Sequence, residues 1–262
     1  MSKDSRRLVG PEGSTPYSAY MAAGEGGVGR QGRKEGEHRK VFLKTGVVSQ
    51  AKGSAYLEQG GTKVMVGVYG PREVQLRRDF SMRGQLTAEL KFAPFACAAR
   101  RGQQADAEEE ELGLVLGEAL ASTVCLHRYP KSAIEVFVTV LEDDGAVLAA
   151  ALTAAGLALA DAGIHMFDLV VGAAVVARGE AVLVDPQRGE GYRAGGEGGE
   201  VTVGLLPTLD QVVACLSEGR LAPEQLSAAL GAATEAAAVL LPAVQQCLVE
   251  RLKRRQQEKP QT

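Results

Sequence analysis

The stretch AVLAAALTAAGLALADAG, residues 146–163, decides the fold. Its residues are almost all small or apolar, and Gly163 is of the type that most often ends a helix in the left-handed conformation. Alanine and glycine lie on nearly all faces of such a helix, so neighbouring elements can approach it closely from several sides. We therefore expect a buried helix packed against a sheet. The apolar run over residues 146–160 is too short and too rich in alanine to span a bilayer, so no membrane contact is expected.

The segments on either side of this helix show strand and helix patterns. Alternating or β-branched runs bounded by Gly, Pro and Asp predict strands over residues 41–48, 54–58, 62–69, 86–92, 134–140, 168–177, 181–184, 201–206 and 211–216. Helical spacing predicts one helix from about residue 105 to the residues before Tyr129-Pro130. A second begins at Pro223 and runs towards Arg255, with a kink at Pro242. This order indicates an α/β fold with mixed α+β sheets.

Composition places the chain among ordinary globular proteins. Its 262 residues are 45% hydrophobic and carry a formal net charge of −3, which gives no overall field that would attract nucleic acid. The four cysteines form no CxxC pair and have no clustered His, so we expect neither a metal site nor a cofactor. Residues 1–10 lack the apolar run of a signal peptide, and the cysteines are of the kind found reduced, which together favour an intracellular protein.

The ends of the chain differ in composition from its centre. Residues 1–38 are rich in Gly, Ser, Glu and Arg without periodicity, which is typical of a flexible arm. The GxGxxG match at residues 27–32 follows no strand and precedes no helix, so it does not indicate dinucleotide binding. We expect a flexible arm over residues 1–38, a folded domain over residues 39–250 and a basic, flexible tail over residues 251–262.

Three sets of segments within residues 41–250 resemble the ribonuclease PH (RNase PH) family in order and spacing. They are residues 46–58, 61–64 and 69–73; residues 92–95, 129–132 and 141–145; and residues 152–164 and 168–172. Within the family, the stretch SQAKGSAYLE at residues 49–58 is most similar to a ring subunit of the eukaryotic RNA exosome. The resemblance implies an RNase PH-like fold, of the ribosomal protein S5 domain 2-like type, with duplicated βαβ units.

The resemblance also implies partners and a location. Homologous RNase PH-type subunits would pair with the chain as heterodimers in a six-membered ring around an RNA channel, with S1/KH-type cap subunits on one side. The expected locations are the nucleus, nucleolus and cytoplasm.

The active pattern of the family is degenerate in this sequence. Active members cleave RNA with phosphate as the attacking group, which requires cationic donors for the anions and a metal ion held by carboxylates. A Thr-Arg pair before the small-residue helix anchors phosphate in the active pattern, and the matching positions here are Val147 and Leu148. Two Asp six residues apart complete the pattern, and the matching positions are Ala194 and Glu200. The resemblance therefore implies the loss of catalysis, with no catalytic or metal-binding residue.

Arg100 and Arg101 are the candidates for RNA contact, because active members carry an arginine-rich run at this place. A solvated loop is an equally good interpretation of the pair. The acidic run at residues 108–111 opposes RNA locally and is typical of a helix N-terminus on a solvated face.

We therefore expect a non-catalytic structural subunit of an exosome ring that supports 3′-to-5′ RNA processing and degradation. The alternatives are an active phosphate-dependent 3′-to-5′ exoribonuclease with a rearranged site, and a stand-alone RNA-binding module. Leu148 argues against the first alternative, and the net charge of −3 argues against the second.

Overall fold

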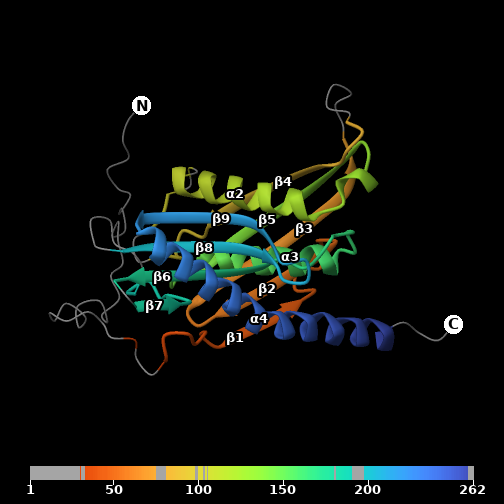
Figure 1. Cartoon of the computed structure of the whole chain (residues 1–262). Coiled ribbons are helices and arrows are strands. Elements are labelled where there is room, and N and C mark those ends of the chain that lie inside the picture. Colours follow the sequence, from red (N-terminus) through yellow and green to blue (C-terminus); the bar gives the residue numbers. More distant parts are fainter. Residues whose placement is uncertain are drawn as a thin grey trace, which may run out of the picture.

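The chain forms two β-sheets with helices packed between and outside them (Figure 1). The computed structural model describes residues 30, 33–74, 81–97, 100–102, 104, 106–179, 181–190 and 198–258. The first sheet has the strand order β1 (Val41–Thr45), β2 (Gly53–Gln59), β3 (Thr62–Glu73), β5 (Ser132–Glu142) and β4 (Gln85–Phe92). The second has the order β7 (Ala181–Val184), β6 (Val171–Arg178), β8 (Gly198–Leu206) and β9 (Gln211–Arg220). The helices are α2 (Ala107–Thr123), α3 (Val147–Asp161), α4 (Pro223–Glu258) and the short 3₁₀ helix η2 (Leu126–Arg128).

The first sheet is mixed, as the sequence predicts. β4 pairs in parallel with β5, whereas β1, β2, β3 and β5 pair in antiparallel order. Side chains on β3 alternate, with Val64, Val66 and Val68 fully buried and the residues between them partly exposed. This alternation is what a strand with one covered face requires.

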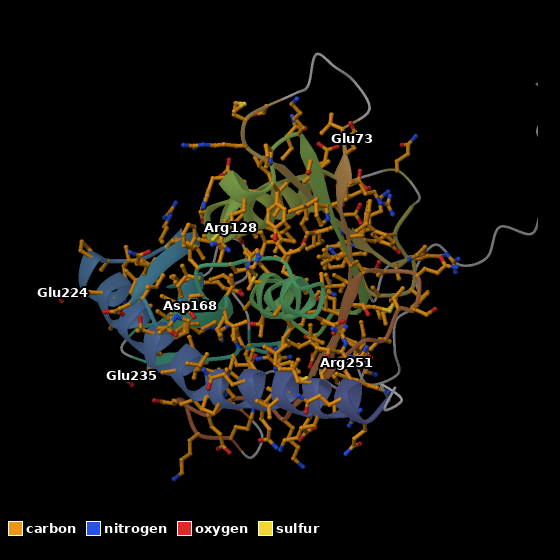
Figure 2. All side chains as sticks on the ribbon, turned by 90° about the vertical axis from the view of Figure 1, so that its right-hand side faces the viewer. Glu73, Arg128, Asp168, Glu224, Glu235 and Arg251 are labelled. Atoms are coloured by element: carbon orange, nitrogen blue, oxygen red, sulfur yellow. The ribbon has the colours of Figure 1, made fainter. Side chains whose placement is uncertain are left out.

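Helix α3 lies between the two sheets and forms the centre of the core. Thirteen of its fifteen residues are buried, and it packs on β2 and β3 on one side and on β6 and β8 on the other. Figure 2 looks along this green helix, which lies in the middle of the molecule with α4 below it. The prediction of a small-residue helix packed on several sides is thus confirmed.

Two glycines let the strands approach α3 closely. A Cβ atom at Gly53 of β2 would lie 2.3 Å from the carbonyl oxygen of Ala158, and one at Gly172 of β6 would lie 2.3 Å from that of Ala149. Both clashes are with helix backbone, so no side-chain rotation could relieve them. The close approach of both sheets to α3 therefore depends on the absence of a side chain at these positions.

Helix α4 covers the outer face of the second sheet and reaches the end of α3. Its buried residues face β6 and β8 and are Ala229, Ala233, Ala236, Ala237, Leu240 and Val244. The buried carboxylate of Asp161 accepts hydrogen bonds from Arg251 (3.3 Å) and Arg255 (2.7 Å) of α4. By length and composition alone α4 could also cross a membrane, and 33% of its most apolar window is buried inside the protein.

The predicted elements are observed with small shifts at their ends. The final helix continues through Pro242 as far as Glu258, three residues beyond the predicted end. The division into arm, domain and tail stays a prediction, although contacts extend beyond both of its boundaries. Arg255 of the predicted tail lies 2.7 Å from Asp161. Arg33 lies 3.3 Å from Glu190, and His38 Nε2 lies 2.9 Å from the carbonyl oxygen of Ala236. Residues 1–29, 31, 32 and 259–262 lie outside the described residues.

Replacement of Gly172 by Ala tests the close approach of β6 to α3. We expect the free energy of unfolding to fall by about 1–3 kcal/mol, because the new methyl group forces the strand away from the helix backbone. Urea denaturation measures the change. Gly36→Ala is the matched control: a Cβ atom there meets nothing within 4 Å, so stability should stay within about 0.5 kcal/mol. Equal stability of the two variants would contradict this account of the core.

Candidate functional site

A pocket of about 180 Å³ lies at the N-terminal end of α3, and we call it the α3 pocket. It brings together residues from α2, β8, β9 and the loop before α3. The lining residues are Phe92, Glu108, Leu112, Asp143, Gly145, Ala146, Val147, Leu148, Glu200, Thr202, Leu216 and Glu218. Three positions that the sequence singled out, Val147, Leu148 and Glu200, thus share one pocket.

The backbone of the pocket is that of a potential anion site. Gly145 has a φ of +91° and Ala146 a φ of +57°, and together they turn the chain into the first turn of α3. No side chain caps this helix end, and the first N–H groups of a helix carry partial positive charge. An anion at this place would therefore be favoured by the backbone alone.

The side chains of the pocket oppose an anion. Val147 and Leu148 fill the first turn of α3 with aliphatic carbon, and none of the described residues that line the pocket is Lys, Arg or His. Four carboxylates, those of Glu108, Asp143, Glu200 and Glu218, surround the same space. Like charges repel a phosphate group, and no fixed cation within the lining offsets them.

Two of these carboxylates are paired with arginines outside the lining. Arg101 lies 2.7 Å from Glu108, and Arg188 lies 2.8 Å from Asp143, whose side chain is 13% exposed. Among the described residues, no group of three or more His, Cys, Asp or Glu side chains is placed to hold a metal ion. Glu108 and Asp143 are therefore held in ion pairs within the protein.

A buried ion pair between Arg39 and Asp185 holds the loop that forms the pocket. Arg39 Nη2 lies 2.6 Å from Asp185 Oδ1, and the exposed fraction of both residues is 5% or less. The same guanidinium donates to the carbonyl oxygens of Asp144 (3.0 Å) and Gly145 (3.2 Å). Burial would raise the pKa of Asp185, but the hydrogen bonds and charge of Arg39 outweigh it and lower the pKa below its ordinary value.

The sequence and structure comparisons agree on the family. Residues 37–165 match the RNase PH family, described as "3′ exoribonuclease family, domain 1". The chain is 43% identical to the human exosome complex component MTR3 over 97% of its own length and 98% of that protein. It is 35% identical to exosome complex component Rrp41 of Cenarchaeum symbiosum, covering 78% of this chain and 83% of that protein. The chain belongs to the RNase PH family.

Solved structures of RNase PH relatives show the same fold. The Archaeoglobus fulgidus exosome with RNA bound to its active site aligns with a TM-score of 0.70 and 27% identity. That alignment covers 81% of this chain and 91% of the archaeal chain. Rice Rrp46 aligns with a TM-score of 0.71 at 21% identity, over 82% of this chain and 97% of the rice chain. The RNase PH-like fold expected from the sequence is thus confirmed.

The structure separates the two arginines that were candidates for RNA contact. Arg100 is exposed, as a solvated loop residue would be. Arg101 lies with its guanidinium carbon 4.0 Å from the ring centre of Phe92 and forms the ion pair with Glu108. Burial would lower the pKa of Arg101, but hydrogen bonds to Glu108 and Cys97 raise it above its ordinary value. Ala194 lies outside the described residues.

One acidic residue has a role that the sequence did not reveal. The run at residues 108–111 was interpreted as a solvated face, which is wrong for Glu109, because Glu109 is buried. Its carboxylate accepts hydrogen bonds from the backbone N–H of Phe92 (2.9 Å) and of Asp106 (3.4 Å), the latter as part of a capping box. The sequence signal was present, since Asp106 and Glu109 have the capping-box spacing.

Replacement of Asp185 by Asn tests the buried ion pair. We expect the free energy of unfolding at neutral pH to fall by about 3–5 kcal/mol, because Arg39 keeps its charge and loses its partner. A carboxyl whose pKa is lowered in the folded state stabilises it above its ordinary pKa of 3.8 and stops doing so as the pH falls through the lowered value. The difference between wild type and variant should therefore shrink below pH 3.8.

Urea denaturation across this pH range measures the effect. The control is Glu142→Gln in the exposed pair Lys63–Glu142, whose atoms lie 2.7 Å apart. That change should cost far less stability than Asp185→Asn, because water screens the pair. A loss for Asp185→Asn as small as that of the control would refute the role assigned to the buried pair.

Proposed function

We propose that this chain is a structural subunit of an exosome ring and has no phosphorolytic activity of its own. The similarity to proteins named as exosome complex components, over nearly the whole chain, supports the assembly. The absence of activity is supported by the α3 pocket. Val147 and Leu148 occupy its helix end, and four carboxylates surround it.

Chemistry explains why this pocket argues against catalysis. Phosphorolysis brings an anionic nucleophile next to the phosphodiester of RNA, so two anions must be held in contact. Loss of a single preorganised donor typically costs about 10²–10³ in rate. Here the two matching positions carry apolar side chains. Among the described residues, Arg101 and Arg188 contact acidic residues of the lining, and both are paired with those carboxylates. The backbone N–H groups at the start of α3 would then have to offset the apolar side chains at these positions and the repulsion by the carboxylates of the lining.

The similarity to exosome components also supports a proposal for the partners of this chain. The partners would be homologous RNase PH-type subunits in a six-membered ring, with S1/KH-type cap subunits and RNA in the central channel. An exosome of this kind would act in rRNA processing and mRNA decay in the nucleus, nucleolus and cytoplasm. The archaeal exosome core, with which this chain aligns at a TM-score of 0.67 and 25% identity, supports the ring.

A phosphorolysis assay tests the absence of activity. The purified chain, alone and mixed with a homologous subunit, is incubated with 3′-labelled RNA, Mg²⁺ and orthophosphate. We expect no labelled nucleoside diphosphate from the chain alone, because its pocket cannot hold the attacking phosphate. An archaeal exosome core run in parallel shows that the assay works. Phosphate-dependent release by the chain alone would overturn the proposal and favour the active exoribonuclease.

The two candidate arginines should behave differently towards RNA. We expect Arg100→Ala to weaken RNA binding about two- to fivefold in the assembled ring, as loss of one exposed phosphate contact does. Arg101→Ala should instead lower thermal stability, because Arg101 links Phe92 to Glu108. Fluorescence anisotropy with labelled RNA and thermal melting measure the two effects. A loss of RNA affinity with Arg101→Ala alone would reverse this assignment.

A further inference from the structure

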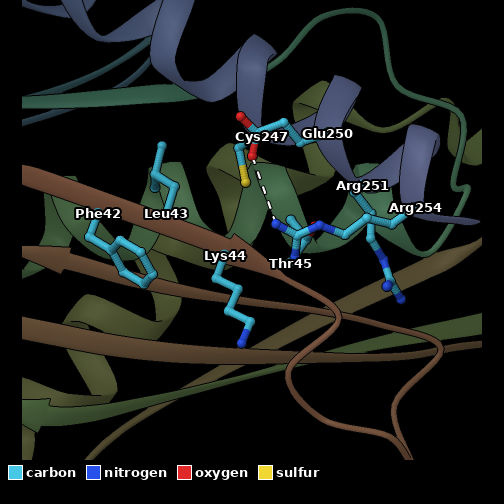
Figure 3. A pocket seen from close by; sticks show the side chains of 8 residues that line it. All are labelled: Phe42, Leu43, Lys44, Thr45, Cys247, Glu250, Arg251 and Arg254. Atoms are coloured by element: carbon cyan, nitrogen blue, oxygen red, sulfur yellow. Dashed lines mark ion pairs between the residues drawn. The ribbon is translucent and has the colours of Figure 1, made fainter.

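A groove of about 230 Å³ lies between the edge strand β1 and the C-terminal half of α4 (Figure 3). We call it the β1–α4 groove. Its lining residues are Phe42, Leu43, Lys44, Thr45, Cys247, Glu250, Arg251 and Arg254. None of them has a part in the α3 pocket, so the groove is a separate feature of the surface.

The groove carries more positive than negative charge. Lys44 comes from the strand, Arg251 and Arg254 come from the helix, and Glu250 is the single acidic lining residue. Arg251 is fixed by its ion pair with the buried Asp161. Arg254 is 61% exposed and lies 4.0 Å from Glu250, at the limit of an ion pair. Such an exposed pair contributes little, so Arg254 can exchange Glu250 for another carboxylate.

The rest of the groove is apolar. Phe42 is 55% exposed and packs edge-on against Tyr56 of β2. Leu43 and Cys247 lie on the α4 side of the strand, whereas Phe42 and Lys44 point to its opposite side, as Figure 3 shows. An extended segment along this edge would turn alternate side chains to Arg254 on the α4 side and to Phe42 on the opposite side, which favours an acidic residue adjacent to an apolar one.

The strand edge favours an extended peptide as the occupant. Gly46 donates to the carbonyl oxygen of Ser54, and Gly60 donates to that of Lys40, so the even-numbered residues of this stretch bond to β2. The N–H and C=O groups of Leu43 consequently point away from β2, towards the outer edge. A peptide offers both a donor and an acceptor to such an edge, whereas the backbone of RNA offers few donors.

We propose that the β1–α4 groove is a docking site for an extended acidic segment of a partner protein. One acidic side chain of the segment faces Arg254 on the α4 side of β1, and its apolar neighbour packs on Phe42, beside Lys44, on the opposite side. A volume near 230 Å³ is smaller than a pocket for a typical small-molecule ligand and suits one or two inserted side chains. RNA is the less favoured occupant, because the chain has a net charge of −3 and three cations in one short groove form no long phosphate track.

Selection from a random peptide library displayed on phage tests the proposal with the full chain as bait. The expected peptides carry Asp or Glu next to Leu, Ile or Phe. The double variant Lys44→Glu/Arg254→Glu should bind the selected peptides at least about tenfold more weakly, because both flanking charges are reversed. Lys253→Glu is the matched control: it makes the same kind of charge change on α4 at an exposed residue outside the lining, and it should keep wild-type affinity.

A second variant raises affinity instead of lowering it. Glu250→Gln removes the single acidic lining residue and should tighten binding of the same peptides about two- to threefold. Thermal melting of all variants confirms that they are folded. The proposal fails if the double variant binds the peptides as well as wild type does, or if the selected peptides carry no acidic residue. It also fails if an oligouridylate binds wild type, is lost in the double variant, and no peptide shows that loss.

Discussion

The buried pair between Arg39 and Asp185 connects parts of the chain that are far apart in the sequence. Arg39 precedes β1, Asp185 follows β7, and the same guanidinium reaches Thr62 in β3 and the carbonyl oxygens before α3. Removing two charges from water is costly, so the pair is tolerated because nearly every donor and acceptor in it is satisfied. The result is a fixed joint between the two sheets at the end where α3 begins.

The position of α3 follows from that joint and from the small side chains around it. The pair sets where the helix starts, and Asp161 with its two arginine partners from α4 sets where it ends. Between these points, Gly53 and Gly172 allow the sheets to close on the helix from opposite sides. Electrostatics therefore fixes the two ends of the helix, while packing fixes its sides.

Local patterns predicted most elements, because the way each element is buried depends on residues that lie close together in the sequence. The alternation of Val64, Val66 and Val68 and the alanines of α3 are examples. The Arg39–Asp185 pair joins residues 146 positions apart, so no local pattern could reveal it. Burial of Glu109 was missed for a related reason. Its partner, the N–H of Phe92, belongs to a strand whose distance from the helix depends on the tertiary fold.

In the α3 pocket, the backbone and the side chains act on an anion in opposite ways. The uncapped helix end and the tight turn at Gly145 and Ala146 still offer N–H groups to an anion. That field is worth about 0.3–1 kcal/mol at an exposed helix end and falls off within the first turn. Four carboxylates lie at the same place, two of them paired with Arg101 and Arg188, and no Lys, Arg or His stands among the described residues that line the cavity. Full charges outweigh the partial charges of a helix end, so the side chains, not the backbone, decide what this pocket repels.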